Sequence, residues 1–239
     1  MGKMGVTDRE TDEVLEKAAQ APHVLPAALL QRIAGSLPTP LTAVRPLPPA
    51  WVLTCTLVLL CAAVAVAGAA RAGFYGFEKM SGTARVLISS ALLVLAWISG
   101  AGFVHAMIPG SRRRATPAAI LGLGTLTLAA VLALLFRDYR ISHFISAGIV
   151  CLLVGLCHAI PAGLLSWLVL RRGFAVNPVA AGLVAGTLAG LAGVGMLELH
   201  CANFQAAHVL VWHTAVVPLS GSMGALLAWM LRARSPSSG

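Results

Sequence analysis

The stretch PVAAGLVAGTLAGLAGVGMLE, residues 178–198, decides the fold class of this chain. It contains no charged residue before Glu198, so it meets the requirement of about 20 apolar residues for a helix that crosses a bilayer. Gly182, Gly186 and Gly190 recur at every fourth position, which places them on one helix face and lets a second helix approach closely. We expect this row to pack against another helix of the same chain, with a dimer interface as the alternative.

Five further stretches have the same character, and they cover roughly 50–70, 86–108, 117–136, 144–170 and 207–231. The whole chain is 58% hydrophobic and only 10% charged. We therefore predict an all-α polytopic membrane protein, with a bundle of six transmembrane helices over 50–231 and a short tail over 232–239. Only residues 1–49 remain for a water-soluble region, which is small for an independently stable domain.

The first 49 residues predict two short amphipathic helices followed by a proline-rich connector. Thr7 is followed three residues later by Glu10, the spacing of a capping box at the start of a helix. Apolar residues then recur near the helical period, and they are Val14, Leu15 and Ala18 in the first helix and Leu29, Leu30 and Ile33 in the second. Helices this short bury their apolar stripes poorly against each other, so we expect the stripes to contact a partner protein or the membrane surface.

The basic residues are distributed unequally between the two sides of the predicted bundle. The formal net charge is +9, but the first 49 residues are neutral and the excess lies in clusters beside the spans. This pattern indicates orientation signals rather than direct binding of nucleic acid. Twelve Lys and Arg residues fall on the side of the termini and five on the other side. The positive-inside rule then places both termini in the cytoplasm and the loop after the fifth span outside.

A polar cluster marks the junction between the fifth and sixth spans. Its members are Glu198, His200, Cys201, His208 and His213. Ionisable groups at membrane depth are costly and indicate a functional site. These residue types suit zinc or copper, but their spacings match no closed structural zinc pattern. His208 and His213 are five residues apart, so we expect them to diverge around a helix. A metal site, hydrogen-bonded anchoring of the loop, and sensing chemistry all stay open.

The five cysteines differ in their predicted depth. Cys55 and Cys61 lie in the first span, and Cys157 lies midway through the fourth. Cys151 lies about two turns inside the outer end of the fourth span, while Cys201 belongs to the outer loop. Only Cys151 and Cys201 can both approach the oxidising side, where disulfides persist. The chain has no Cys-x-x-Cys motif, which argues against a thiol-exchange enzyme.

Features that would indicate catalysis, haem binding or transport are scarce. The acids outside the N-terminal region are Glu78, Asp138 and Glu198, and they form no pair inside the bundle. His158 has no histidine at matched depth in another span, as haem held by two histidines would require. We expect no enzyme and no cofactor beyond transient metal binding at the polar cluster. Two other classes compete with this interpretation. The first is a transporter or another membrane protein that binds a small molecule or an ion, and the second is a membrane oxidoreductase.

Several motifs in the C-terminal half carry a family resemblance. They run from Cys151 through Leu170-Arg171-Arg172-Gly173 and Asn177-Pro178 to the glycine-rich fifth span, Leu199-His200-Cys201 and Val211-Trp212-His213, and Val44-Arg45-Pro46-Leu47-Pro48 precedes the first span. With these motifs the chain resembles the negative-regulator-of-sigma-F family of six-span membrane anti-sigma factors. The similarity covers most of residues 44 to 231.

The resemblance implies a multi-pass protein of the bacterial inner membrane that holds an extracytoplasmic-function sigma factor inactive and releases it under stress. The family's outward-facing cysteines correspond to Cys151 and Cys201, which the resemblance therefore implies as the sensing residues. The expected partners are the sigma factor and the lipid bilayer, and the resemblance assigns no oligomeric state. Three further cysteines, the extra histidines and a longer acidic N-terminal extension depart from the family pattern, and they leave the stimulus open.

Overall fold

The computed structural model describes residues 16–17, 27–36, 48–108, 115–170 and 175–234. The chain divides into two units, Met1–Leu47 and Pro48–Gly239. In the first unit the structure describes helix α2, Ala27–Ser36, which contains the predicted stripe Leu29, Leu30 and Ile33. The other predicted stripe, Val14, Leu15 and Ala18, lies outside the described residues.

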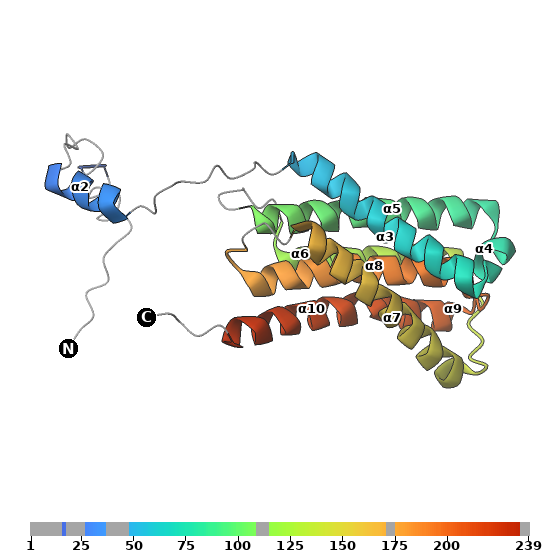
Figure 1. The fold of residues 1–239 in the computed structure, drawn as a ribbon. Coiled ribbons are helices and arrows are strands. Elements are labelled where there is room, and N and C mark those ends of the chain that lie inside the picture. The colour runs from blue at the N-terminus through green and yellow to red at the C-terminus, as the bar shows by residue number, and fades with distance from the viewer. Residues whose placement is uncertain (1–15, 18–26, 37–47, 109–114, 171–174, 235–239) are drawn as a thin grey trace. The chain divides into compact units, whose positions relative to one another are not determined.

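Among its described residues, the second unit contains six helices that are long and apolar enough to cross a membrane, which confirms the predicted all-α, six-span fold. They are α3 (Ala50–Ala72), α5 (Gly82–Met107), α6 (Pro117–Leu135), α7 (Phe144–Leu170), α8 (Pro178–His200), and a last span made of α9 (Ala206–His208), the π-helix η1 (Val209–His213) and α10 (Thr214–Arg234). The start of α3 and the end of α10 lie at the same end of the bundle, and the short helix α4 (Tyr75–Lys79) lies at the opposite end (Figure 1).

Capping residues set where three of the spans begin. Ser81, Thr116 and Asn177 each accept a side-chain hydrogen bond from the backbone N–H three residues later, at 3.1–3.3 Å. Pro117 and Pro178 then occupy the first helical position, where the missing N–H of proline costs no hydrogen bond. The second span therefore begins at Gly82 and not near residue 86, because Ser81 caps it.

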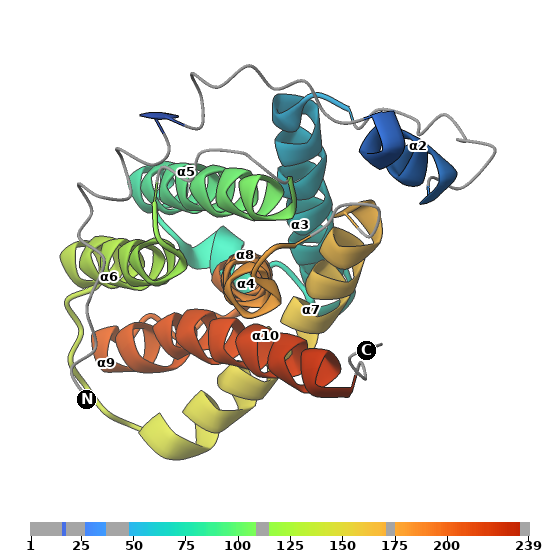
Figure 2. The same cartoon turned by 90° about the vertical axis from the view of Figure 1, so that its left-hand side faces the viewer.

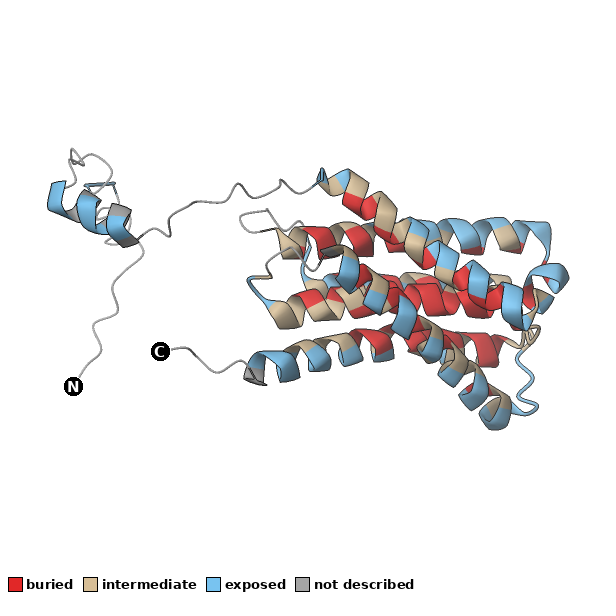
Figure 3. Cartoon of the chain, viewed as in Figure 1, coloured by how far each residue is buried: buried red, intermediate tan, exposed pale blue. Residues whose placement is uncertain are grey.

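Helix α8 forms the centre of the bundle (Figure 2). Its most apolar window is 67% buried, whereas the corresponding windows of the other spans are 22–39% buried. Figure 3 shows buried residues along the interior and exposed residues on the outer sides of the surrounding helices. Large apolar side chains such as Leu126, Leu134 and Trp167 are exposed there, as expected for a surface that contacts lipid.

The glycine row of α8 faces α10. A Cβ atom on Gly182 would overlap the backbone oxygen of Gly224, and one on Gly186 would overlap the backbone oxygen of Ser220. A Cβ on Gly190 would lie 2.9 Å from the backbone of α10. The absence of side chains therefore lets the two helix backbones touch, so the row packs within the chain.

Candidate functional site

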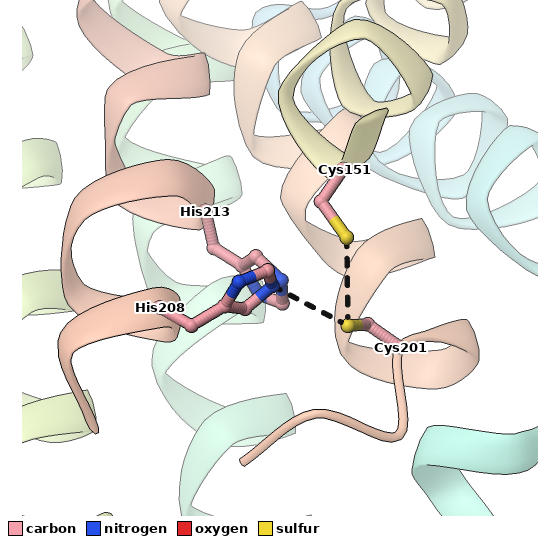
Figure 4. A group of neighbouring side chains, drawn as sticks. All are labelled: Cys151, Cys201, His208 and His213. Atoms are coloured by element: carbon pink, nitrogen blue, oxygen red, sulfur yellow. Dashed lines mark hydrogen bonds between the residues drawn. The ribbon is translucent and has the colours of Figure 1, made fainter. Parts of the chain in front are cut away.

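Four side chains from separate segments converge near the end of the bundle that carries α4 (Figures 1 and 4). Cys151 comes from α7, Cys201 follows α8, His208 ends α9, and His213 ends η1. One nitrogen or sulfur atom from each residue lies within 4.8 Å of those of the others. We call these four residues the Cys–His cluster.

The two thiols of the cluster are in contact. The Sγ atoms of Cys151 and Cys201 are 3.6 Å apart, and the Cys201 Sγ is 3.7 Å from Nε2 of His208. Cys201 is buried and Cys151 is partly buried. The hydrogen bond with Cys151, together with burial, raises the pKa of the Cys201 thiol above its usual value, and the contacts with His208 and His213 oppose this rise. Because a thiolate is the reactive form, Cys201 on its own is a poor nucleophile at neutral pH.

The π-helix explains why both histidines face the thiols. In a regular α-helix, residues five positions apart point about 140° away from each other, so the expectation that His208 and His213 diverge assumed α-helical geometry. The π-helix η1 pairs residues i and i+5, which stacks them on one side of the helix. The two rings meet edge to face, with centroids 5.3 Å apart, and that expectation was wrong.

Glu198 lies behind His213 and outside the Cys–His cluster. Its Oε1 accepts a hydrogen bond from Nδ1 of His213 at 2.7 Å, and both side chains are almost fully buried. Within the described part of the chain, Nε2 of His213, Nδ1 of His208 and Oε2 of Glu198 are buried without a hydrogen-bond partner. Leaving such groups unpaired costs about 1–3 kcal/mol each, which is unusual for a site that serves packing alone.

His200 faces another part of the structure. Its Nδ1 lies 3.0 Å from the backbone oxygen of Gly73, and its ring packs against Tyr75 at 5.8 Å. The structure thus separates the five residues predicted as a metal set. Cys201, His208 and His213 are in the cluster, Glu198 orients His213, and His200 links the end of α8 to the segment before α4. The sequence pattern did not group Cys151 with the histidines, because it lies 50 residues before Cys201.

The loop between α6 and α7 is hydrogen-bonded to the start of the last span, a contact that the sequence does not indicate. The backbone oxygen of Asp138 accepts a hydrogen bond from the N–H of Ala206 at 2.6 Å. The guanidinium of Arg140 donates two hydrogen bonds to the Asp138 carboxylate, at 2.9 and 3.0 Å, and its backbone N–H donates a third at 3.2 Å. These bonds lower the pKa of Asp138 below its ordinary value. The Asp-x-Arg spacing in the sequence indicates the local ion pair. The hydrogen bond from Ala206 to Asp138 joins residues far apart in the sequence, so no local pattern indicates it.

The remaining cysteines and His158 have other surroundings. Cys55 and Cys61 belong to α3, and Cys157 is exposed on α7. Nδ1 of His158 lies 2.8 Å from the backbone oxygen of Val154, one turn earlier in the same helix. The ring of His158 packs against Gly68 of α3. In the part of the chain that the structure describes, these residues are not members of the Cys–His cluster.

Comparison with known proteins identifies the family. A family model described as negative regulator of sigma F matches residues 37–232, which include all six spans and the Cys–His cluster. No curated protein and no solved structure matches the chain significantly. The family model covers most of the chain, and the chain therefore belongs to the family of negative regulators of sigma F.

Proposed function

We propose that this protein is a bacterial inner-membrane anti-sigma factor that holds an extracytoplasmic-function sigma factor inactive and releases it when the Cys151–Cys201 thiol pair reacts. The observation that carries the proposal is the 3.6 Å contact between these two thiols in a family of negative regulators of sigma F. The contact joins α7, about two turns after its start at Phe144, to the loop after α8. A chemical change at one point therefore acts on two spans.

The proposed orientation places the thiols outside and both termini in the cytoplasm. The start of α3 and the end of α10 share one end of the bundle, while the Cys–His cluster lies toward the other end (Figure 1). The excess of basic residues on the side of the termini, twelve against five, supports a cytoplasmic location for that side. Residues 1–49 then face the compartment that contains the sigma factor.

Oxidation is the simplest covalent signal at this pair. Two thiols lose two protons and two electrons to a two-electron oxidant such as a peroxide, and one S–S bond forms. The two sulfur atoms must approach from 3.6 Å to about 2 Å for this bond. Because α7 and α8 pack closely, with Gly193 against the backbone of Gly155, a shift of α7 at the thiols is passed along the α7–α8 contact.

The N-terminal apolar stripes supply the surface for the sigma factor in this proposal. Leu29, Leu30 and Ile33 recur along α2, and Val14, Leu15 and Ala18 form the preceding stripe in the sequence. The acidic residues around the first stripe complement the basic surface with which a sigma factor contacts DNA phosphates. Occupying that surface would keep the sigma factor off its promoter.

A co-purification experiment tests this proposal. We expect the full chain in detergent to retain its sigma factor, and deletion of residues 1–36 to abolish retention. We expect Cys151→Ser and Cys201→Ser to retain the sigma factor but to fail to release it after peroxide treatment, whereas the control Cys157→Ser releases it as the parent does. Retention by the deletion variant would overturn the assigned surface, and normal release by both thiol variants would overturn the assigned sensor. Binding of a soluble sigma factor also separates this function from transport or oxidoreductase activity.

A further inference from the structure

The atoms of the Cys–His cluster have the spacing of a tetrahedral metal site. Zinc binds thiolate sulfur at about 2.3 Å and imidazole nitrogen at about 2.0–2.1 Å, which puts neighbouring ligand atoms about 3.3–3.8 Å apart. The Sγ atoms of Cys151 and Cys201 are 3.6 Å apart, and Nε2 of His208 is 3.7 Å from the Cys201 sulfur. All four atoms lie within 4.8 Å of one another, so shifts of about 1 Å complete the tetrahedron.

The hydrogen bonding of His213 leaves the correct nitrogen free for a metal ion. Nδ1 of His213 bonds to the Glu198 carboxylate, while Nε2 is buried and has no hydrogen-bond partner among the described residues. In metalloproteins, a carboxylate that accepts the N–H of a ligating histidine fixes both its tautomer and its ring orientation. Glu198 occupies that position behind His213, at 2.7 Å.

We propose that Cys151, Cys201, His208 and His213 bind one zinc ion or a similar thiophilic d10 cation, with Glu198 as the positioning residue of His213. Two thiolates and two imidazoles exclude hard ions such as Mg²⁺ and Ca²⁺, which require oxygen ligands. The two thiolates neutralise the divalent charge, which a poorly hydrated site requires. Since the protein fills all four tetrahedral positions, the site is structural and leaves no open position for catalysis.

The metal ion would connect α7, the loop that follows α8, and the start of the last span, where α9 and η1 carry the two histidines. The regulatory role of this metal site rests on the proposed function. Oxidation of the two thiolates to a disulfide transfers two electrons to the oxidant, removes two of the four ligands, and releases the cation to solvent. The signal then consists of two changes: the metal ion no longer joins the segments, and a disulfide joins Cys151 to Cys201.

Cobalt binding to the purified full chain tests the site without a sigma factor. The protein is stripped of metal with a chelator under reducing conditions in detergent, and Co²⁺ is added. We expect one Co²⁺ per chain, a thiolate-to-cobalt charge-transfer band, the intense visible d–d bands of tetrahedral cobalt, and displacement by one equivalent of Zn²⁺. Absence of the charge-transfer band from the parent protein would overturn the proposal.

Substitutions assign the ligands. We expect Cys201→Ser and His213→Gln to lose the tetrahedral spectrum, with circular dichroism and gel filtration confirming that each variant is folded. Glu198→Gln keeps all four ligands, and we expect a 10–100-fold weaker affinity with the same spectrum. The matched controls are Cys157→Ser, on the same helix as Cys151, and His200→Gln, next to Cys201, and both should bind as the parent does. A tetrahedral spectrum that survives His213→Gln, or that is lost in Cys157→Ser, would overturn the assigned ligand set.

The outcomes separate the metal site from the regulatory function. A parent protein that retains its sigma factor but shows no cobalt spectrum overturns the metal site alone. A parent protein with the expected cobalt spectrum that does not retain a sigma factor supports the metal site and overturns the proposed function.

Discussion

The two ends of α8 are held in the bundle by different physical means. At one end, Gly182 and Gly186 press against the backbone oxygens of Gly224 and Ser220, with no room for a side chain. At the other end, Glu198 and the loop residue Cys201 are held by hydrogen bonds to side chains of the last span. The same two segments of chain, α8 and the last span, form both contacts.

The difference indicates which end can respond to a signal. Contact between glycine backbones depends on shape alone, and no proton, electron or ion changes it. The contacts of the Cys–His cluster depend on groups that bind protons and metal ions and that can be oxidised. A signal can therefore act on one end of α8 while the other end stays fixed.

The largest effect should follow from adding a side chain to the glycine row. Leucine at position 186 would overlap the backbone of α10, so we expect Gly186→Leu to destabilise the protein by about 3 kcal/mol or more. Gly122→Leu is the matched control, because a Cβ on Gly122 meets nothing within 4 Å. Thermal unfolding in detergent, followed by circular dichroism, would measure both variants. Equal melting temperatures would contradict the fixed contact between α8 and α10.

A smaller loss should follow from separating the buried pair at the other end. His213→Leu leaves the Glu198 carboxylate buried without its partner, and we expect a loss of about 2–3 kcal/mol in unfolding free energy. The double variant Glu198→Leu, His213→Leu removes both polar groups and should regain part of that loss. Measured losses that simply add in the double variant would show that the two residues do not interact.

Removing one thiol of the pair should have little effect on stability but a large effect on disulfide formation. In protein freed of metal, we expect Cys151→Ser to alter the unfolding free energy by about 1 kcal/mol or less, yet to abolish peroxide-induced cross-linking. In the parent protein, peptide mass mapping after peroxide treatment should find Cys151 linked to Cys201 and Cys157 unlinked. A dominant link through Cys157 would contradict the 3.6 Å pairing of the thiols.

The smallest effect concerns the exposed ion pair between Asp138 and Arg140, in the loop before α7. The bonds from Arg140 lower the pKa of Asp138 below its ordinary 3.8, so the pair stabilises the fold above that pH, and the contribution is lost as pH falls through the lowered pKa. We expect Asp138→Asn to melt slightly below the parent at neutral pH and at the same temperature at strongly acidic pH. Melting curves across this range would measure the difference, and a gap that does not shrink on acidification would contradict the pairing.

Hydropathy predicted the six spans because each is a long apolar segment with few or no charged residues, but the ends of the spans depend on local chemistry. Ser81 begins the second span several residues before the predicted start, and α4 lies in a segment too short to register as a span. The Cys–His cluster was predictable only in part. His208 and Cys201 lie close in the sequence, whereas Cys151 joins them through the packing of α7. The π-helix could not be foreseen, because no residue type within Val209–His213 requires it.

Because of the π-helix, the structure of this segment depends more on its number of residues than on which residues it contains. A π turn accommodates one more residue than an α-helical turn over the same rise. Deleting one residue within Val209–His213 would favour a regular α-helix and would change the angular phase of His208 relative to α10 by about 100°. Either His208 would turn away from Cys201, or α10 would present a different face to Gly186. A substitution in this segment changes only the contacts of one side chain. A single deletion instead disrupts either the contact of His208 with Cys201 or the packing of α10 on Gly186, which lie at opposite ends of α8.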